Sequence, residues 1–149
     1  NLTEALVLLY GKEKMKTVWK EFQTITGQER LERIEETGRK LAEEFSLSAV
    51  VITGVDQQEE GDTVKMGNLV LENGKCSWVF AEKAGGSYSG TGDIFASILS
   101  AGLVKGYSME ACADMAVDFI SASIRDAVKE GTDRNDGVCF ELHLGRLVR

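Results

Sequence analysis

Apolar side chains recur every three or four residues in two stretches of the chain, a spacing that lines one face of a helix. Gln28–Phe45 predicts an amphipathic helix, and Ser108–Glu130 predicts a longer one that Ser108 caps. The expected inner faces are Leu31, Ile34, Gly38, Leu41 and Phe45 in the first and Met109, Ala113, Ala116, Val117, Ile120, Ile124 and Val128 in the second.

Two further stretches predict helices. Thr3–Tyr10 is expected to form a short helix that Gly11 closes, followed by a polar stretch of loop and irregular helix over Lys12–Thr26. Gly92–Val104 is apolar on nearly every side, so the pattern predicts a buried helix there.

Strand patterns fill the middle of the chain. The β-branched run Ser48–Thr53 is typical of a strand that is buried on both faces. Val64–Glu72 and Lys75–Glu82 flank Asn73-Gly74, a strong hairpin signal. The alternating run Val138–Leu144 predicts a last strand, with the single histidine on its exposed face.

The order of these elements indicates the fold class. A helix followed at once by a buried strand is the rhythm of α/β proteins. We therefore expect one α/β domain, with a mostly parallel sheet between helices.

Composition narrows the possible partners. The chain has 149 residues and a net charge of −7, which makes nucleic acid and anionic membranes poor partners. No apolar run approaches the roughly 20 residues of a membrane span. Cys76, Cys112 and Cys139 are far apart and odd in number. This usage fits a reducing, cytoplasmic location and argues against a disulfide framework or a zinc site.

Several familiar motifs fail on inspection. Gly11-Lys12 lacks the earlier glycine and the following Ser or Thr of a P-loop, and Phe95 stands where the dinucleotide fingerprint needs its third glycine. A Ser-His-Asp triad would have to use His143, the only histidine. Asp133–Gly137 is only faintly like a calcium loop, and we expect a turn there.

The tetrad Gly90-Thr91-Gly92-Asp93 is the strongest candidate for chemistry. It follows the flexible run 84–89 and opens an apolar helix. Glycines let the backbone approach a ligand, and the first amides of a helix lack intrahelical acceptors, so the tetrad predicts an anion site. A carboxylate at Asp93 repels phosphate, which makes sense if it takes a proton from the attacking group. The alternative is an ordinary helix start, where Asp is favoured by about 0.3–1 kcal/mol.

The order of these motifs resembles a known family. The run Ser89–Ser97 looks like the anion-hole motif of the ribokinase superfamily and, more narrowly, of its pyridoxal kinase branch. Asn1-Leu2-Thr3-Glu4 is similar to the N-x-x-E motif of that branch, and Val50–Gly54 is similar to the strand whose end touches ATP phosphates. Arg134–Glu141 is similar to bacterial members. The resemblance implies a three-layer α/β/α fold, of which only the C-terminal part is matched.

The resemblance implies roles for the tetrad. Asp93 would be the base that deprotonates the substrate's hydroxymethyl group. The amides of Gly90, Thr91 and Gly92 would hold the phosphoryl group in transfer.

It also implies roles for residues outside the tetrad. Glu4, with Asn1 beside it, would position Mg²⁺ and its waters near the phosphates. Thr53 would contact ATP phosphate, and Gly54 beside it stands where the branch commonly has a hydroxyl-bearing residue. Tyr88 would flank the nucleotide.

The implied activity is ATP-dependent phosphorylation of pyridoxal, pyridoxine or pyridoxamine on the 5′-hydroxymethyl group. Hydroxymethylpyrimidine kinases usually carry Cys where Asp93 stands, so that branch is a weaker match. The alternatives are a sugar or other small-alcohol kinase, since these share the tetrad, and a non-catalytic nucleotide-binding or assembly segment.

The extent of the match adds two expectations. We expect residues 1–149 to carry the ATP and Mg²⁺ site and the base, without the N-terminal part of the domain, and to be poorly active alone. An exposed sheet edge and apolar surface predict a homodimer.

Overall fold

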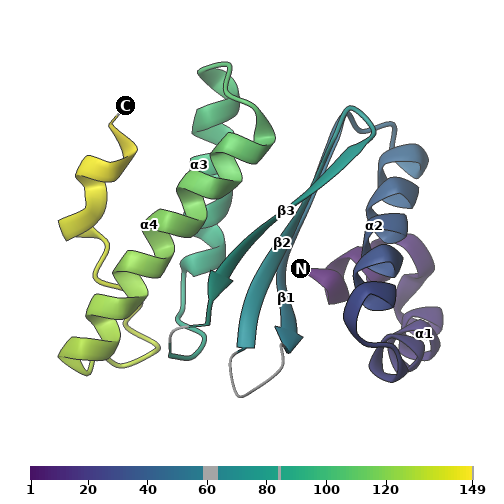
Figure 1. Cartoon of the computed structure of the whole chain (residues 1–149), viewed down its shortest axis with the longest axis horizontal. Coiled ribbons are helices and arrows are strands. Elements are labelled where there is room, and N and C mark those ends of the chain that lie inside the picture. Colours follow the sequence, from purple (N-terminus) through teal and green to yellow (C-terminus); the bar gives the residue numbers. More distant parts are fainter. Residues whose placement is uncertain (59–63, 84, 149) are drawn as a thin grey trace. The chain divides into compact units, whose positions relative to one another are not determined.

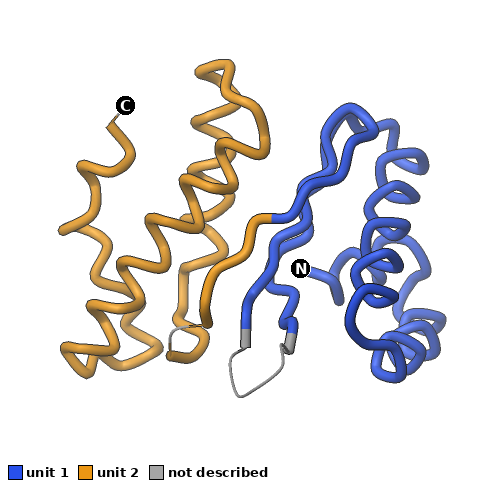
Figure 2. Tube along the Cα trace, in the orientation of Figure 1, with its two compact units in different colours: residues 1–78 blue, residues 79–149 orange. Residues whose placement is uncertain are grey.

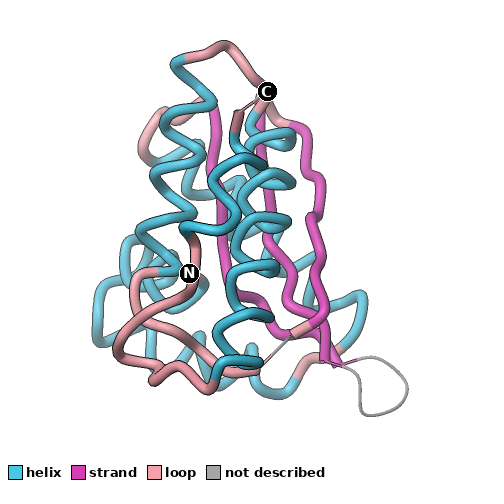
Figure 3. The backbone as a smooth tube through the Cα atoms, turned by 90° about the vertical axis from the view of Figure 1, so that its left-hand side faces the viewer, coloured by secondary structure: helices cyan, strands magenta, loops and turns pink. Residues whose placement is uncertain are grey.

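The computed structural model describes residues 1–58, 64–83 and 85–148. The elements, shown in Figure 1 and coloured by type in Figure 3, are α1 (Leu2–Thr24), α2 (Gly27–Glu44), β1 (Ala49–Gln58), β2 (Val64–Glu72), β3 (Lys75–Glu82), α3 (Thr91–Val104), α4 (Met109–Glu130) and the 3₁₀ helix η1 (Glu141–Leu147). The chain forms two compact units, Asn1–Trp78 and Val79–Arg149, which meet within β3 (Figure 2).

The three strands pair in the order β1-β2-β3. β1 and β2 are antiparallel, with Ala49 opposite Glu72 and Gln57 opposite Lys65. β2 and β3 are joined by the two-residue turn Asn73-Gly74, in which both residues have positive φ, as hairpin turns of this length require. The α/β class is confirmed, but the described sheet is antiparallel rather than mostly parallel. The connections explain this, because parallel neighbours need a crossover of a dozen or more residues.

The first unit packs α1 and α2 against one face of the β1–β2 pair (Figure 1). Its most buried side chains come from every element of the unit and are Leu6, Phe22, Ile34, Ile52 and Leu69. Gly38 lets α2 lie close to the sheet, because a Cβ added there would stand only 3.1 Å from Leu69 Cδ2. The core therefore fixes both the helix pair and the strand that carries Thr53.

The predicted helix over Gln28–Phe45 is confirmed, although Phe45 lies beyond its end and is exposed. The expectation of loop and irregular helix over Lys12–Thr26 is confirmed for the helix and wrong for the loop. The chain breaks its helix at Gly11 (φ 70°, ψ 165°) and then resumes it to Thr24. Apolar side chains at helical spacing, Met15, Val18, Trp19 and Phe22, pack on the core and explain the second helical segment.

In the second unit, α4 begins as predicted. Ser108 Oγ accepts the N–H of Ala111 at 3.2 Å, which caps the helix. Its inner face differs in part from the prediction, since Val128 is exposed while Cys112, Phe119 and Ala127 are buried.

α3 is buried on one face only, through Phe95, Ile98 and Gly102. The expectation of a buried helix is therefore wrong along its outer face, and Val104 at its end is 91% exposed. α3 packs on α4 so closely at Gly102 that an added Cβ would overlap Cys112 Sγ.

The predicted last strand is wrong, because the chain forms η1 there instead. Two contacts tie η1 to α4: His143 Nε2 lies 2.9 Å from Asp126 Oδ2, and Arg146 Nη1 lies 2.8 Å from Asp118 Oδ2. His143 is therefore largely buried against α4 and does not lie on a strand face. These two side-chain contacts hold η1 against α4.

Within the described residues, no helix is both long enough and apolar enough to cross a bilayer.

The contact between α3 and α4 gives a stability prediction. Gly102→Ala places a methyl group on the sulfur of Cys112, so we expect the free energy of unfolding in urea to fall by about 1–3 kcal/mol. The double variant Gly102→Ala, Cys112→Ala removes the sulfur and should recover most of the loss. A single variant as stable as the parent chain contradicts this packing.

Candidate active site

The tetrad Gly90-Thr91-Gly92-Asp93 forms the start of α3, as the sequence predicts. Gly90 is the N-cap and has a left-handed backbone (φ 80°, ψ −9°), a conformation that glycine adopts without steric cost. Its carbonyl accepts the N–H of Ile94 at 3.0 Å, which is the first helical bond. Thr91 Oγ1 donates to the carbonyl of Tyr88 at 3.0 Å and ties the helix to the preceding loop.

The backbone amides of the tetrad are available to a ligand. In the part of the chain that the structure describes, the N–H groups of Gly90, Thr91 and Gly92 form no hydrogen bond with a backbone acceptor. Gly90 and Gly92 are exposed, and a Cβ added to either meets nothing within 4 Å. The helix dipole adds about half a positive charge at this end. The arrangement can receive an anion through its main chain alone.

Asp93 lies in the first turn of α3 and its side chain is exposed. It forms no ion pair or hydrogen bond with any described residue. An acid in this position without a partner can accept a proton from a group that approaches the amides.

The loop before the tetrad is packed against the second unit's own core. Gly85 (φ +71°) lies against Val128 and Ile124, so a side chain there would overlap α4. Tyr88 is only 7% exposed, and its ring edge stands 3.8 Å from the Cβ position of Gly85. The geometry therefore gives Tyr88 a packing role in the loop. Ala84, the first residue of the predicted flexible run, lies outside the described residues.

The structure brings Asn1 and Glu4 together as a helix cap. Asn1 Oδ1 accepts the N–H of Glu4 at 3.1 Å, and Glu4 Oε2 accepts from the backbone nitrogen of Asn1 at 2.7 Å. This reciprocal pair is a capping box. The hydrogen bond from the terminal nitrogen, followed by its positive charge, lowers the pKa of Glu4.

The exposure and hydrogen bonds of Glu4 show whether this end of α1 suits Mg²⁺. The side chain of Glu4 is 71% exposed, and only one of its carboxylate oxygens takes part in the cap. Mg²⁺ usually keeps several waters and binds one or two carboxylates together with substrate phosphates. A single exposed carboxylate fits that pattern. No cluster of three or more His, Cys, Asp or Glu side chains occurs in the described ranges to form a dedicated metal site.

Thr53 and Gly54 form a bulge in β1. Ile52 pairs with Leu69 and Val55 with Gly67, so the two residues oppose Asn68 alone. Gly54 has φ +70°, and its N–H donates to Asn68 Oδ1 at 3.3 Å. Thr53 is therefore not at a strand end as predicted, and β1 is not buried on both faces, since Thr53 is only half-buried.

The candidate residues thus fall in two groups. Asn1, Glu4, Thr53 and Gly54 belong to the first unit, and the tetrad and Tyr88 belong to the second.

Two residues that support these groups were missed from the sequence. Asn68 is buried and holds the bulge beside Thr53. A Gly-Asn pair inside a strand pattern was the available signal, because both residues are poor strand formers. Arg134 contacts the glycine loop before the tetrad, and no local pattern points to that contact.

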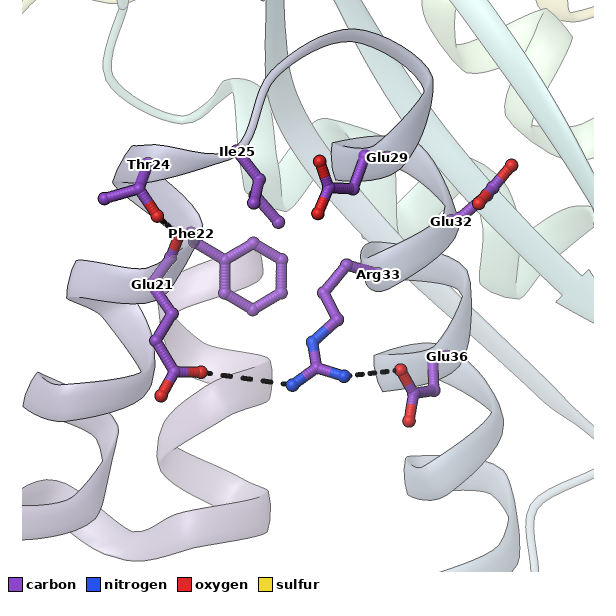
Figure 4. A pocket seen from close by; sticks show the side chains of 8 residues that line it. All are labelled: Glu21, Phe22, Thr24, Ile25, Glu29, Glu32, Arg33 and Glu36. Carbon is purple, nitrogen blue, oxygen red and sulfur yellow. Dashed lines mark hydrogen bonds and ion pairs between the residues drawn. The ribbon is translucent and has the colours of Figure 1, made fainter.

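A cavity of about 360 Å³ in the first unit takes no part in these groups (Figure 4). Its lining comes from the end of α1 and the start of α2 and comprises Glu21, Phe22, Thr24, Ile25, Glu29, Glu32, Arg33 and Glu36. Arg33 points between Glu36 at 2.8 Å and Glu21 at 3.9 Å. Hydrogen bonds from Lys40 and then Arg33 lower the pKa of Glu36. The basic groups are already paired, so the cavity offers no anion site.

Comparison with known proteins places the chain in a family. Residues 18–137, well over half of the chain, match the phosphomethylpyrimidine kinase family, and the chain therefore belongs to it. The predicted resemblance is confirmed at this level. No curated protein matches the chain.

Solved structures agree with the family. A candidate phosphomethylpyrimidine kinase from Bacteroides thetaiotaomicron VPI-5482, in a crystal form with pyridoxal, is 27% identical with a TM-score of 0.70, over 79% of this chain and 41% of that one. A rhombohedral form of the same protein is 26% identical with a TM-score of 0.69, over 79% of this chain and 40% of that one. Pyridoxal kinase from Lactobacillus plantarum has the same fold. It is 23% identical with a TM-score of 0.64, over 83% of this chain and 42% of that one. The chain spans about two fifths of the length of these relatives.

The geometry at the tetrad gives a prediction with an internal control. At Gly90 a side chain meets open space but must adopt a left-handed backbone, so Gly90→Ala should cost about 1–2 kcal/mol of unfolding free energy. Gly92 has an ordinary helical backbone, so Gly92→Ala should not destabilise the chain. Equal effects in a urea titration contradict the assigned conformation of Gly90.

Proposed function

We propose that the chain carries the ATP and Mg²⁺ site and the catalytic base of a kinase that phosphorylates a hydroxymethyl group of a vitamin B6 compound. One observation carries the proposal: the exposed, unpartnered carboxylate of Asp93 stands in the first turn of a helix whose leading amides lack acceptors. Membership of a kinase family supports it.

The tetrad supplies what phosphoryl transfer needs from a protein, which is positioning and stabilisation of charge. The amides of Gly90, Thr91 and Gly92 donate to the oxygens of the γ-phosphoryl group. Asp93 takes the proton of the substrate hydroxyl, whose oxygen forms the new bond to phosphorus while the bond to ADP breaks. Glu4, with Asn1 beside it, would hold Mg²⁺ through its waters, and the ion would neutralise phosphate charge. Thr53 and Gly54 would contact ATP phosphate, and Tyr88 would support the loop beside the nucleotide.

The choice of substrate rests on two points. Asp93 stands where hydroxymethylpyrimidine kinases usually have Cys, and the 27% identical relative was crystallised with pyridoxal. The family name allows the pyrimidine as a second candidate. A panel of pyridoxal, hydroxymethylpyrimidine and ribose, tested with the full-length protein and scored by ADP release, separates these candidates from a sugar kinase.

Asp93→Asn tests the mechanism. Because the chain alone is expected to be poorly active, turnover is measured in a full-length protein that contains it. As the general base is lost, turnover should fall there by about 10²–10⁴-fold. Affinity for MgATP, measured by titration calorimetry, should stay the same or tighten slightly because a repelling charge is gone. Asp114→Asn, an exposed acid of α4, removes the same charge as a control.

Three outcomes of that experiment differ in meaning. Loss of turnover in the Asp93 variant alone supports the proposal. Unchanged turnover removes Asp93 from the mechanism. Binding of MgATP without turnover in the full-length protein favours the non-catalytic nucleotide-binding alternative.

The proposal includes a homodimer. β1 and β3 are the outer strands of the sheet, and unpaired strand edges favour association. Light scattering at micromolar concentration should give twice the chain mass of 16.3 kDa. A single species of the chain mass contradicts this part of the proposal.

A further inference from the structure

The loop that leads into the tetrad is held by a second loop of the same unit, and Arg134 of that loop touches it twice. The guanidinium of Arg134 lies so close to the main chain of Gly86 that an added Cβ would overlap it. The carbonyl of Arg134 accepts the N–H of Ser89 at 2.9 Å. Ser89 directly precedes Gly90, so the second contact lies one residue from the start of the tetrad.

The turn around Arg134 fixes both contacts. Asp133 Oδ1 accepts the N–H of Asn135 at 2.8 Å, and the carbonyl of Asp133 accepts the N–H of Asp136 at 3.0 Å. This Asx turn spans Arg134 and sets the direction of its carbonyl and its side chain. Gly137 (φ +91°) lies next to the same loop, since a Cβ there would stand 3.4 Å from the carbonyl oxygen of Ser89.

The guanidinium of Arg134 forms no salt bridge with an acid of the described residues. Among the residues that the structure describes, Arg134 has no ion pair, although Asp133 and Asp136 are close in sequence. The planar group instead lies against the peptide of Gly86, where only a glycine leaves room. Arginine suits such a flat contact, and the compact ammonium of lysine does not.

We propose that Arg134 is a positioning residue for phosphoryl transfer, because its guanidinium at Gly86 holds residues 86–89 in the conformation that directs the tetrad's amides. This rests on the kinase function proposed above. Main-chain donors stabilise a phosphoryl group best when they are fixed before it arrives, and a loop of small residues does not fix itself.

The test compares Arg134→Ala, Gly86→Ala and the double variant in the chain as it stands. The first change deletes the guanidinium, and the second fills its place with a methyl group. If the guanidinium acts at Gly86, both single variants have the same effect and the double variant adds nothing. Arg134→Lys should behave as Arg134→Ala. Arg125→Ala, an exposed arginine of α4, removes the same charge elsewhere in the unit as a control.

Two measurements report the effect. Amide hydrogen exchange at Ser89, followed by NMR without ligand, should become about tenfold faster in all four loop variants and stay unchanged in the control. Affinity for MgATP should weaken about tenfold in the same variants, with melting temperatures close to that of the parent chain.

The outcomes separate the two proposals. Additive effects of Arg134→Ala and Gly86→Ala, or unchanged exchange at Ser89, overturn the positioning role. A chain that does not bind MgATP but shows the expected exchange pattern overturns the kinase function and supports the positioning of the loop by Arg134.

Discussion

The left-handed backbone of Gly90 is the constraint on which the candidate phosphate site depends. Residues with a Cβ resist this conformation, and directly after it the chain enters α3, whose first amides form no backbone hydrogen bond. The next 14 residues then form a regular helix, whose dipole strengthens those amides as donors. The same turn determines the position of the Asp93 carboxylate, because Asp93 lies in the first turn of α3. A change of backbone at one residue therefore alters the donors, the field and the base together.

Small residues set the geometry of the second unit in more than one place. Gly102 allows α3 to approach Cys112 of α4, and Gly86 leaves room for the guanidinium of Arg134. The first contact holds the helix that begins with the tetrad, and the second holds the loop that precedes it. The amides of the tetrad thus lie between two close contacts, each made possible by the absence of a side chain.

Local signals in the sequence predicted the elements that depend on local interactions. The turn Asn73-Gly74 determines its own hairpin, so both arms were predicted with the observed bounds, Val64–Glu72 and Lys75–Glu82. Periodicity and a cap predicted α4 in the same way. The helical run after Gly11 also had a local signal, the helical spacing of Met15, Val18, Trp19 and Phe22. The replacement of a last strand by η1 depends on partners far along the chain, the acids of α4. The pattern over Val138–Leu144 contains neither of these acids.

The same distinction between local and long-range interactions applies to the candidate site. The tetrad was predicted because glycines, a helix start and an acid are adjacent in sequence. Arg134 and Asn68 were not, because each acts on a loop or bulge that only folding brings near. The position of Thr53 was predicted in the right strand but at its end, since the continuation of β1 through Val55 depends on pairing with β2.

The capping box at Asn1 and Glu4 has a consequence for any cation that reaches this helix end. The carboxylate that would attract the ion is also an acceptor for the backbone nitrogen at the helix start. Loss of a helix cap typically costs about 0.5–2 kcal/mol, so a direct ligand bond to the same oxygen competes with the first turn of α1. An ion held through a water shell avoids this competition. A cation that binds Oε1, the carboxylate oxygen outside the cap, also leaves the capping bond in place, so the cap favours that oxygen over Oε2.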